Sequence, residues 1–394
     1  MNILFIFYTF IKPERGGVQR VTDLLGKGLA ERGHSVYFLS LKEPVNTLKE
    51  QGDFSCRQLA IDGYDRDPDK YLEDYISILK DKKIEYVISQ EYNTISHFLL
   101  SNTPAGIKKV SVHHLQPFGY IGKERKLKLV THPESLYYQV IKWLTIIFPV
   151  IYRRKALKES RREFTHNLQS SDALVFLSER FKTRVVRFMP EVETSKLHAI
   201  NNPNTFKIED AQTYIQQKQK LIIFVGRLVD PPKNIKGFLD MWRLFSKDHH
   251  DWKAQIIGDG PEMQRCRNYI KTHNLKRIQL MGSCKNVADF YKRASFICLT
   301  SLYEGWGMVL TEGMAYGCLP VVFDSYESAY DIINDGENGI ISKSFSAADM
   351  AERIGNVINK PSEIKLMQES AKKTVERFNL DVILPQWENL LQSL

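Results

Sequence analysis

The chain has 394 residues, of which 43% are hydrophobic and 26% charged, and its net charge is +9. This length predicts two domains, and the ordinary composition excludes an intrinsically disordered chain or a fibrous repeat. The charge excess lies in residues 101–200, which hold 18 Lys and Arg against 8 Asp and Glu. Nucleic acid or an acidic membrane surface could face this region, and a solvated basic face is the plainer alternative.

The N-terminal run MNILFIFYTF is predicted as a buried first strand, because it lacks the basic leader and cleavage site of a signal peptide. The five cysteines are scattered and mostly lie in apolar runs. That pattern is typical of buried thiols in a reducing cytoplasm, and it lacks the paired spacing of a zinc site.

The first half of the chain alternates β-rich runs with helical stretches, which is the rhythm of βαβ units. The expected strands are residues 3–7, 35–41, 85–89, 108–112 and 173–178, with a helix from Gln19 to Arg32. A second series follows a polar stretch near Asn202, with strands at 220–226, 254–258, 278–282, 296–300 and 320–324. Continuous apolar strands suit parallel sheets covered on both faces, so we predict an α/β fold with domains at 1–202 and 203–375.

Residues 136–155 join a largely apolar stretch to the cations Arg153, Arg154 and Lys155. The stretch is short for a membrane span and is interrupted by Lys142 and Pro149. One helical face could carry the apolar residues Leu136, Val140, Leu144, Ile147 and Ile151. Such a helix could lie in an anionic lipid interface, or be buried at a domain interface or an oligomer contact.

The segment YEGWGMVLTEGMAYG, residues 303–317, holds two glutamates around a glycine-rich turn between an expected strand and helix. The turn at Gly305 and Gly307 lets the backbone approach a ligand, and the first amides of the following helix attract anions. We expect phosphates at these amides, paired ribose hydroxyls at Glu312 and sugar hydroxyls at Glu304. As an isolated motif, Glu304 could equally be a capping residue and Glu312 a solvated one.

This segment resembles the E-x7-E signature of retaining glycosyltransferases of family 4, which have the GT-B fold of two Rossmann-like domains facing a central cleft. GGVQR near the start, VGRL followed by a lysine, IIGDGPE, GSCKNVADFYKRASFICLTS and DIINDGENG match further motifs in the expected order. The resemblance implies an acceptor-binding domain at 1–202, a nucleotide-sugar-binding domain at 203–375 and a C-terminal helix, about 376–394, that packs back on the first domain.

The resemblance also assigns roles to residues. It implies that Arg227 and Lys233 hold the donor diphosphate and stabilise the charge that grows on it as the glycosidic bond breaks. It aligns His113 with the active-site histidine and His114 with the variable next position, in a register uncertain by one residue. A histidine there could hydrogen-bond the transferred sugar or assist proton movement, and two adjacent histidines at a strand end could equally be partly exposed structural residues. The implied catalytic residues are His113, Glu304, Arg227 and Lys233, and the implied substrate-binding residues are Gly16, Gly17, His114, Gly258, Asp259, Gly260, Gly305, Trp306, Gly307, Met308, Val309 and Glu312.

Metal-dependent glycosyltransferases hold the diphosphate through an ion on an Asp-x-Asp motif. Asp65, Asp67 and Asp69 have that spacing, but Pro68 favours a turn and we interpret the segment as a polar loop. Because Arg227, Lys233 and a helix end supply positive charge, we expect no metal and no other cofactor.

The sequence therefore predicts a hexosyltransferase that uses a UDP-sugar, or less favourably a GDP-sugar, in surface polysaccharide or lipopolysaccharide biosynthesis. Its expected partners are the donor, a saccharide or lipid-linked saccharide acceptor and an anionic membrane surface, and not nucleic acid. We expect a cytoplasmic protein attached peripherally to the inner membrane face. The alternatives are a non-catalytic nucleotide-binding protein and an NAD-dependent oxidoreductase, although no G-x-G-x-x-G follows the first strand.

Overall fold

The computed structural model describes residues 1–394 except 43–56, 122, 124–135 and 207–210. The chain divides into two compact units. Unit 1 comprises Met1–Pro117, Lys158–Thr205 and Phe378–Leu394, and unit 2 comprises Phe118–Leu157 and Phe206–Arg377. Residues 118–157, predicted as part of the first domain, group with the second half of the chain.

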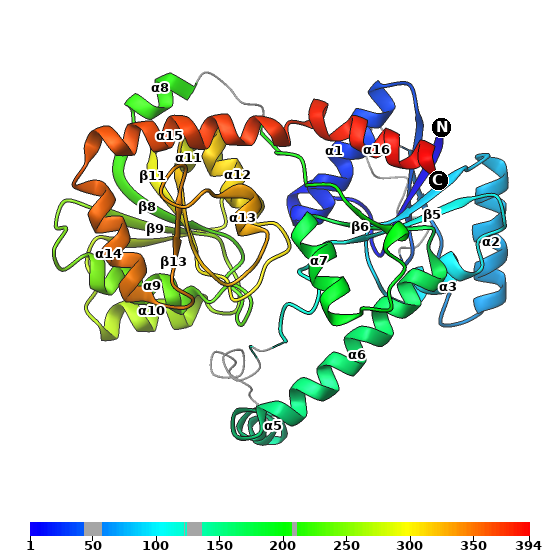
Figure 1. Ribbon diagram of the computed structural model, residues 1–394, viewed down its shortest axis with the longest axis horizontal. Helices are drawn as coiled ribbons and strands as arrows, with labels where there is room; N and C mark the ends of the chain where they lie inside the picture. Colours follow the sequence, from blue (N-terminus) through cyan, green and yellow to red (C-terminus); the bar gives the residue numbers. More distant parts are fainter. Residues whose placement is uncertain (43–56, 122, 124–135, 207–210) are drawn as a thin grey trace. The chain divides into compact units, whose positions relative to one another are not determined.

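Unit 1 is built on a parallel sheet of seven strands in the order β3-β2-β1-β4-β5-β6-β7 (Figure 1). The strands are β1 Asn2–Phe7, β2 Ser35–Ser40, β3 Arg57–Ala60, β4 Tyr86–Ser89, β5 Lys108–His113, β6 Ala173–Phe176 and β7 Leu197–Ala199. Its helices are α1 Gly17–Glu31, α2 Pro68–Asp81, α3 Thr94–Ser101, α7 Glu179–Phe188, α16 Leu380–Ser393 and the later part of α6 Pro149–Ser170. The strand order reverses direction between β1 and β4, which makes their carboxyl ends a topological switch point.

Unit 2 contains a parallel sheet of six strands in the order β10-β9-β8-β11-β12-β13. The strands are β8 Gln219–Val225, β9 Lys253–Ile257, β10 Ile278–Gly282, β11 Ala294–Leu299, β12 Leu319–Phe323 and β13 Ile340–Ser342. Its helices are α5 Leu136–Ile147, α8 Ala211–Gln216, α9 Ile235–Phe245, α10 Met263–Thr272, α11 Ala288–Arg293, α12 Met308–Ala315, α13 Ala329–Ile332, α14 Ala347–Ile358 and α15 Pro361–Val375. Here the switch point lies between β8 and β11, which are adjacent in the sheet.

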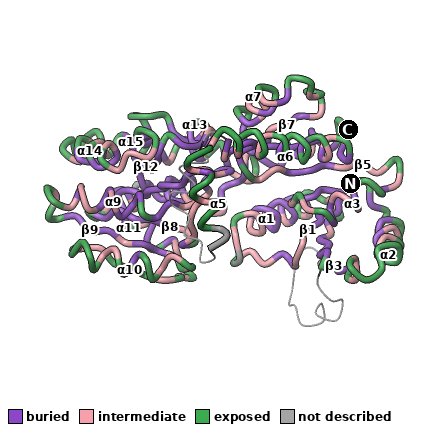
Figure 2. The backbone as a smooth tube through the Cα atoms, turned by 90° about the horizontal axis from the view of Figure 1, so that it is seen from below, coloured by how far each residue is buried: buried purple, intermediate pink, exposed green. Residues whose placement is uncertain are grey.

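Both sheets are buried on both faces, as their continuous apolar strands predict. Every residue of β6, β11 and β12 is buried, and Figure 2 shows buried strands between helices whose outer faces are exposed. Helix α1 shows why the helices dock. Its buried residues Val21, Leu25 and Leu29 recur every four positions and form one apolar stripe.

All ten strands expected from the sequence are present. Three further strands, β3, β7 and β13, were not predicted; they are three or four residues long and lie at sheet edges. Such short runs carry too little periodicity to be distinguished from loops. The buried cysteines are confirmed for Cys266, Cys298 and Cys318, Cys284 is partly exposed, and Cys56 lies outside the described residues.

Helix α16 packs on α1 within unit 1. The Cα of Gly28 lies so close to Leu384 that an added Cβ would come within 2.6 Å of its Cδ1. Arg32 and His34 both donate to the Glu388 carboxylate, at 2.8 Å each, so the C-terminal helix is fixed by packing and charge together.

The single helix expected over 136–155 is two helices, because the chain turns at Phe148 and α6 starts at Pro149. Proline at the start of a helix is favourable and its missing N–H ends the preceding one. Val140, Leu144 and Ile147 are exposed on α5, Ile151 is exposed on α6, and the side chain of Leu136 lies outside those described. In the described part of the chain, no helix is both long and apolar enough to cross a membrane.

Candidate active site

In unit 2, the residues implied by the E-x7-E resemblance gather beyond the carboxyl ends of β8 and β11. β8 ends at Val225, so Gly226 and Arg227 follow it directly, and β11 ends at Leu299, just before the turn that holds Glu304. Open parallel sheets bind ligands at such switch points. The topology therefore brings together segments that lie about seventy residues apart in the sequence.

Lys233 and Glu304 are in direct contact, with the lysine Nζ 2.5 Å from Oε1 of the carboxylate. Their side chains are only 22% and 14% exposed, so the pair is shielded from most of the solvent. Ser301 also donates to Oε1 of Glu304, at 2.6 Å. The two side chains thus form a fixed pair of opposite charges at the mouth of the turn.

The loop that carries Lys233 is fastened to the end of β11. The Asn234 side chain donates to the Thr300 carbonyl at 3.0 Å, and the Thr300 hydroxyl donates to the Asn234 carbonyl, also at 3.0 Å. These reciprocal bonds explain why Lys233 reaches Glu304.

Gly307 is the residue that lets helix α12 start beside Glu304. It caps the helix with φ +83°, a left-handed conformation that an L side chain adopts only with strain. The first amides of α12, at Met308 and Val309, come directly after it and have no acceptor within the helix. An anion-attracting helix end therefore lies next to the Lys233–Glu304 pair.

Glu312 is buried inside α12, with 4% of its surface exposed, and its Oε2 accepts a hydrogen bond of 2.9 Å from the Tyr291 hydroxyl. Trp306 is also buried, at 2% exposed. Trp306 therefore belongs to the packing beneath the turn, whereas Met308 and Val309 are partly exposed. The sequence did not single out Tyr291, which fixes one oxygen of the second glutamate.

Arg227 is exposed, and the loop in which it lies packs against the GDG segment. The Leu228 amide donates to the Asp259 carbonyl at 2.9 Å. A Cβ added to Gly258 would lie 1.9 Å from the Gly226 carbonyl oxygen, and one on Gly260 would lie 2.5 Å from that of Leu228. These glycines thus allow two loops of the site to touch, which is a structural reason for the motif.

Two further residues of unit 2 contact the turn and carry no sequence signal. Lys123 donates to the carbonyls of Leu302 and Ser325, which ties the two loops together. Tyr326 is 2% exposed, and its hydroxyl lies 3.5 Å from where a Cβ on Gly307 would stand. Burial, with the charge of Glu304 nearby, raises the pKa of Tyr326 well above its ordinary value, so this phenol stays protonated.

Unit 1 has a cavity of about 980 Å³ at the carboxyl edge of its sheet. Its lining comes from the ends of β1, β2, β4 and β5 and from α1 and α6. The lining residues include Tyr8, Val18, Lys42, Gln90, Glu91, His113, His114 and Glu163. The position corresponds to the β1–β4 switch point, where a ligand is expected. Gly16 and Gly17 lie at the start of α1, and Gly16 is its N-cap. A Cβ added to Gly16 would have no atom within 4 Å.

His113 and His114 both line this cavity but differ in surroundings. His113 packs against Phe164 and Phe176, with ring centroids 4.8 and 5.9 Å away, whereas Nε2 of His114 lies 2.6 Å from Oε1 of Gln90. Burial lowers the pKa of His113 to about 4 and that of His114 to about 3. Both rings are therefore neutral near pH 7 and can exchange hydrogen bonds with a hydroxyl.

Glu91 lies at the end of β4 in the same cavity, and it too was missed in the sequence. Its Oε2 accepts from the Tyr8 amide at 3.0 Å. Burial raises the pKa of the Glu91 carboxyl above its ordinary value. A carboxyl here adds an acceptor for hydroxyl groups beside the histidines.

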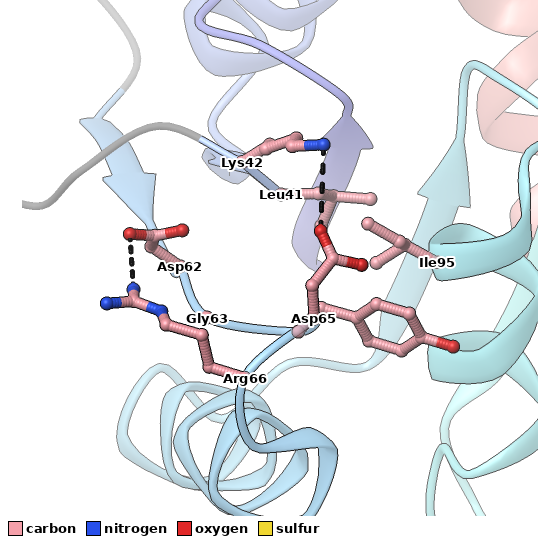
Figure 3. Close-up of a pocket in the computed structure, with 8 residues that line it drawn as sticks. Leu41, Lys42, Asp62, Gly63, Asp65, Arg66 and Ile95 are labelled. Carbon is pink, nitrogen blue, oxygen red and sulfur yellow. Dashed lines mark hydrogen bonds and ion pairs between the residues drawn. The ribbon is translucent and has the colours of Figure 1, made fainter.

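The aspartates of the YDRDPDK segment do not converge on a common point. Figure 3 shows Asp65 facing Lys42 and Asp62 facing Arg66 around a small pocket of about 260 Å³, with ion-pair distances of 3.8 and 2.8 Å. Asp67 instead caps α2 by accepting from the Lys70 amide, and Asp69 lies in the first turn of that helix. Within the described ranges, no group of three or more His, Cys, Asp or Glu side chains could hold a metal ion.

Comparison with known proteins finds a family match in the second half of the chain. Residues 205–374 match the family model of Glycosyl transferases group 1. An uncharacterized glycosyltransferase of Methanocaldococcus jannaschii is 26% identical over 85% of this chain and 88% of its own length. An N-acetyl-D-galactosaminyltransferase of Campylobacter jejuni, named for a saccharide on PP-undecaprenol, is 28% identical over 57% of this chain and 60% of its own length.

The chain spans less than two-thirds of the length of several other relatives that it matches, for example 61% of an uncharacterized glycosyltransferase of Haemophilus influenzae. Among solved structures, HepE of Anabaena in complex with UDP and glucose superposes with a TM-score of 0.73 at 16% identity, covering 100% of this chain and 99% of that one. The two Rossmann-like units of the GT-B fold are thereby confirmed. The family model and the names of the relatives support an enzyme of the glycosyltransferase class.

Proposed function

We propose that the protein is a retaining glycosyltransferase of family 4 that transfers a hexose from a UDP-sugar to a saccharide acceptor. The observation that carries this proposal is the 2.5 Å contact between Lys233 and Glu304, directly before the start of α12. A sugar diphosphate carries phosphate groups and sugar hydroxyls. The cation and the helix N-terminus can bind the phosphates, and the carboxylate can accept hydrogen bonds from the hydroxyls.

In the proposed mechanism the diphosphate lies against the first amides of α12, Arg227 and Lys233. The bond from the anomeric carbon to the phosphate oxygen breaks, and its electron pair leaves with the diphosphate. The acceptor oxygen bonds to the same face of that carbon, and its proton passes to an oxygen of the departing phosphate. Glu304 orients sugar hydroxyls and Glu312 binds the ribose, so neither acts as a nucleophile.

The charge that grows on the leaving group is the reason for the cations. Interactions that strengthen in the transition state raise the rate, and a charge-assisted hydrogen bond contributes about 1.5–3 kcal/mol. Because Lys233, Arg227 and the helix end supply this charge themselves, we propose that activity needs no divalent metal and persists in the presence of a chelator.

We assign the acceptor to the cavity of unit 1, where neutral His113 and His114 and the carboxyl of Glu91 offer hydrogen bonds to a saccharide. The Campylobacter relative is named for an undecaprenol-linked saccharide. By analogy we propose a lipid-linked acceptor, in the synthesis of a surface polysaccharide or lipopolysaccharide. Such an acceptor implies that the enzyme works in the cytoplasm at the inner membrane face.

A thermal-shift panel of UDP- and GDP-sugars tests the donor, followed by product analysis with the best stabiliser. We expect a UDP-sugar to raise the melting temperature, and the product to keep the anomeric configuration of the donor by NMR. A product of inverted configuration would contradict the retaining mechanism. Arg227→Ala should keep the fold yet lose about tenfold or more in turnover, and normal turnover in that variant would contradict the role of the cations.

A further inference from the structure

The largest group of exposed apolar side chains in the described residues lies where α5 meets α6. We call this surface, residues 140–155, the α5–α6 elbow. Its exposed apolar members are Val140, Trp143, Leu144, Ile147, Phe148, Val150 and Ile151, between 40% and 65% exposed. Soluble surfaces rarely leave so many large apolar groups together in water without a partner.

Helical spacing places these side chains together. Val140, Leu144 and Ile147 are separated by four and three residues, so they lie along one face of α5. Val150 and Ile151 occupy the first turn of α6 and continue the apolar surface past Pro149. Figure 1 shows the two helices meeting at an angle, with α6 leading away from the elbow.

The charges around the elbow are of one sign. Residues 136–158 contain five Lys and Arg and no Asp or Glu. Arg154 and Lys155 follow Val150 and Ile151 by four residues, so they stand on the same face of α6 about 6 Å further along its axis. Lys158 repeats the pattern one turn later, and Arg153, Arg154, Lys155 and Lys158 are all exposed.

We propose that the α5–α6 elbow docks on an anionic lipid bilayer, with α5 and the first turn of α6 in the interface and the cations of α6 at the depth of the lipid phosphates. The order of side chains along α6, apolar first and cationic one turn later, matches the order of a membrane from acyl chains to headgroups. A second copy of this chain fits less well, because a symmetric contact would bring the two cation clusters together. The inference does not depend on the transferase reaction.

Trp143 provides a direct probe of the docking. It is 58% exposed, whereas Trp242, Trp252, Trp306 and Trp387 are each 5% exposed or less. A blue shift of fluorescence on mixing the full chain with vesicles therefore reports Trp143 entering an apolar environment. We expect the shift with vesicles that contain phosphatidylglycerol, and much less with phosphatidylcholine alone.

Vesicle co-sedimentation of two variants tests the two components of the surface. Replacing Arg153, Arg154 and Lys155 by Gln should weaken partitioning into phosphatidylglycerol vesicles about 100-fold. Replacing Ile147 and Ile151 by Ser should remove the interfacial insertion and the fluorescence shift. As a matched control, Lys271, Lys365 and Lys373, exposed cations elsewhere in unit 2, are replaced by Gln and should leave partitioning unchanged.

The proposal is overturned if the wild-type chain neither sediments with anionic vesicles nor shows the shift, since that test needs no variant to fold. It is equally overturned if the control variant loses as much binding as the elbow variant. Sedimentation velocity tests whether the elbow instead binds a second copy of the chain. Self-association that depends on concentration and is abolished in the Ile147→Ser, Ile151→Ser variant would assign the elbow to such a contact. No sugar nucleotide is added, so failure of the proposed reaction leaves these outcomes unaffected.

Discussion

At the scale of single residues, Lys233 carries the proposed charge stabilisation. We expect Lys233→Met to lower kcat by about 10- to 100-fold, because the departing diphosphate loses one charge-assisted bond, and Lys233→Arg to recover part of it. Lys236→Met is the control, since Lys236 is 60% exposed and pairs with Asp240 one turn away. Steady-state kinetics with the best donor makes the comparison, and equal rates for Lys233→Met and Lys236→Met would remove Lys233 from the mechanism.

Asp230, in the same loop, makes stability depend on pH. Burial raises the pKa of this carboxyl from 3.8 to about 6. The folded chain thus holds the proton between these values while the unfolded chain releases it. The contribution of Asp230 to stability is therefore greatest below pH 3.8 and is lost as pH rises through 6. We expect the melting temperature of the wild type, relative to Asp230→Asn, to fall by a few degrees between pH 4 and pH 7. A constant difference over that range would show that Asp230 ionises normally.

At the scale of elements, α11 positions α12 through Tyr291 and Glu312. Removing the hydroxyl in Tyr291→Phe leaves a buried carboxyl without one of its donors, which costs about 1.5–3 kcal/mol when the partner is charged. We expect UDP binding to weaken about tenfold by calorimetry, while the melting temperature of the variant changes little. Tyr269→Phe is the matched control, because Tyr269 donates to Asp240 from α10. If the two variants bind UDP equally, Tyr291 does not position Glu312 for the ribose.

The docking of α16 on α1 should weaken in acid. Hydrogen bonds from Arg32 and then His34 lower the pKa of Glu388 from 4.5 to about 2. The folded chain therefore keeps this stabilisation above pH 4.5 and loses it as pH falls toward 2. Glu388→Gln should unfold at lower denaturant concentration than the wild type at pH 7, and the two curves should converge on acidification. The fluorescence of Trp387, which is 3% exposed on α16, follows the unfolding of this helix. As a control, Glu369→Gln, at an exposed position on α15, should unfold as the wild type does.

At the scale of the whole molecule, the sequence predicted the regular parts well and the contacts between them poorly. Long apolar strands and the glycine turn before Met308 carry their own signals, so the two sheets and Glu304 could be named in advance. Lys233 was named through the family resemblance, and its contact with Glu304 was seen only in the structure. Tyr291 and Lys123 could not, because each reaches the site from a segment that only the folded chain brings near. The break at Pro149 was visible, but its consequence, two helices in place of one, needed the structure.

The assignment of donor and acceptor to separate units predicts where UDP protects the chain. Hydrogen exchange should slow in peptides covering 226–234 and 300–312 when UDP is added, because these segments hold the proposed diphosphate and ribose contacts. Peptides covering 90–95 and 112–115, which line the cavity of unit 1, should exchange as before. Glu312→Ala serves as the control and should lose most of the protection at the same UDP concentration. Protection that begins in the unit 1 peptides instead would reverse the assignment, since UDP alone carries no acceptor group to bind there.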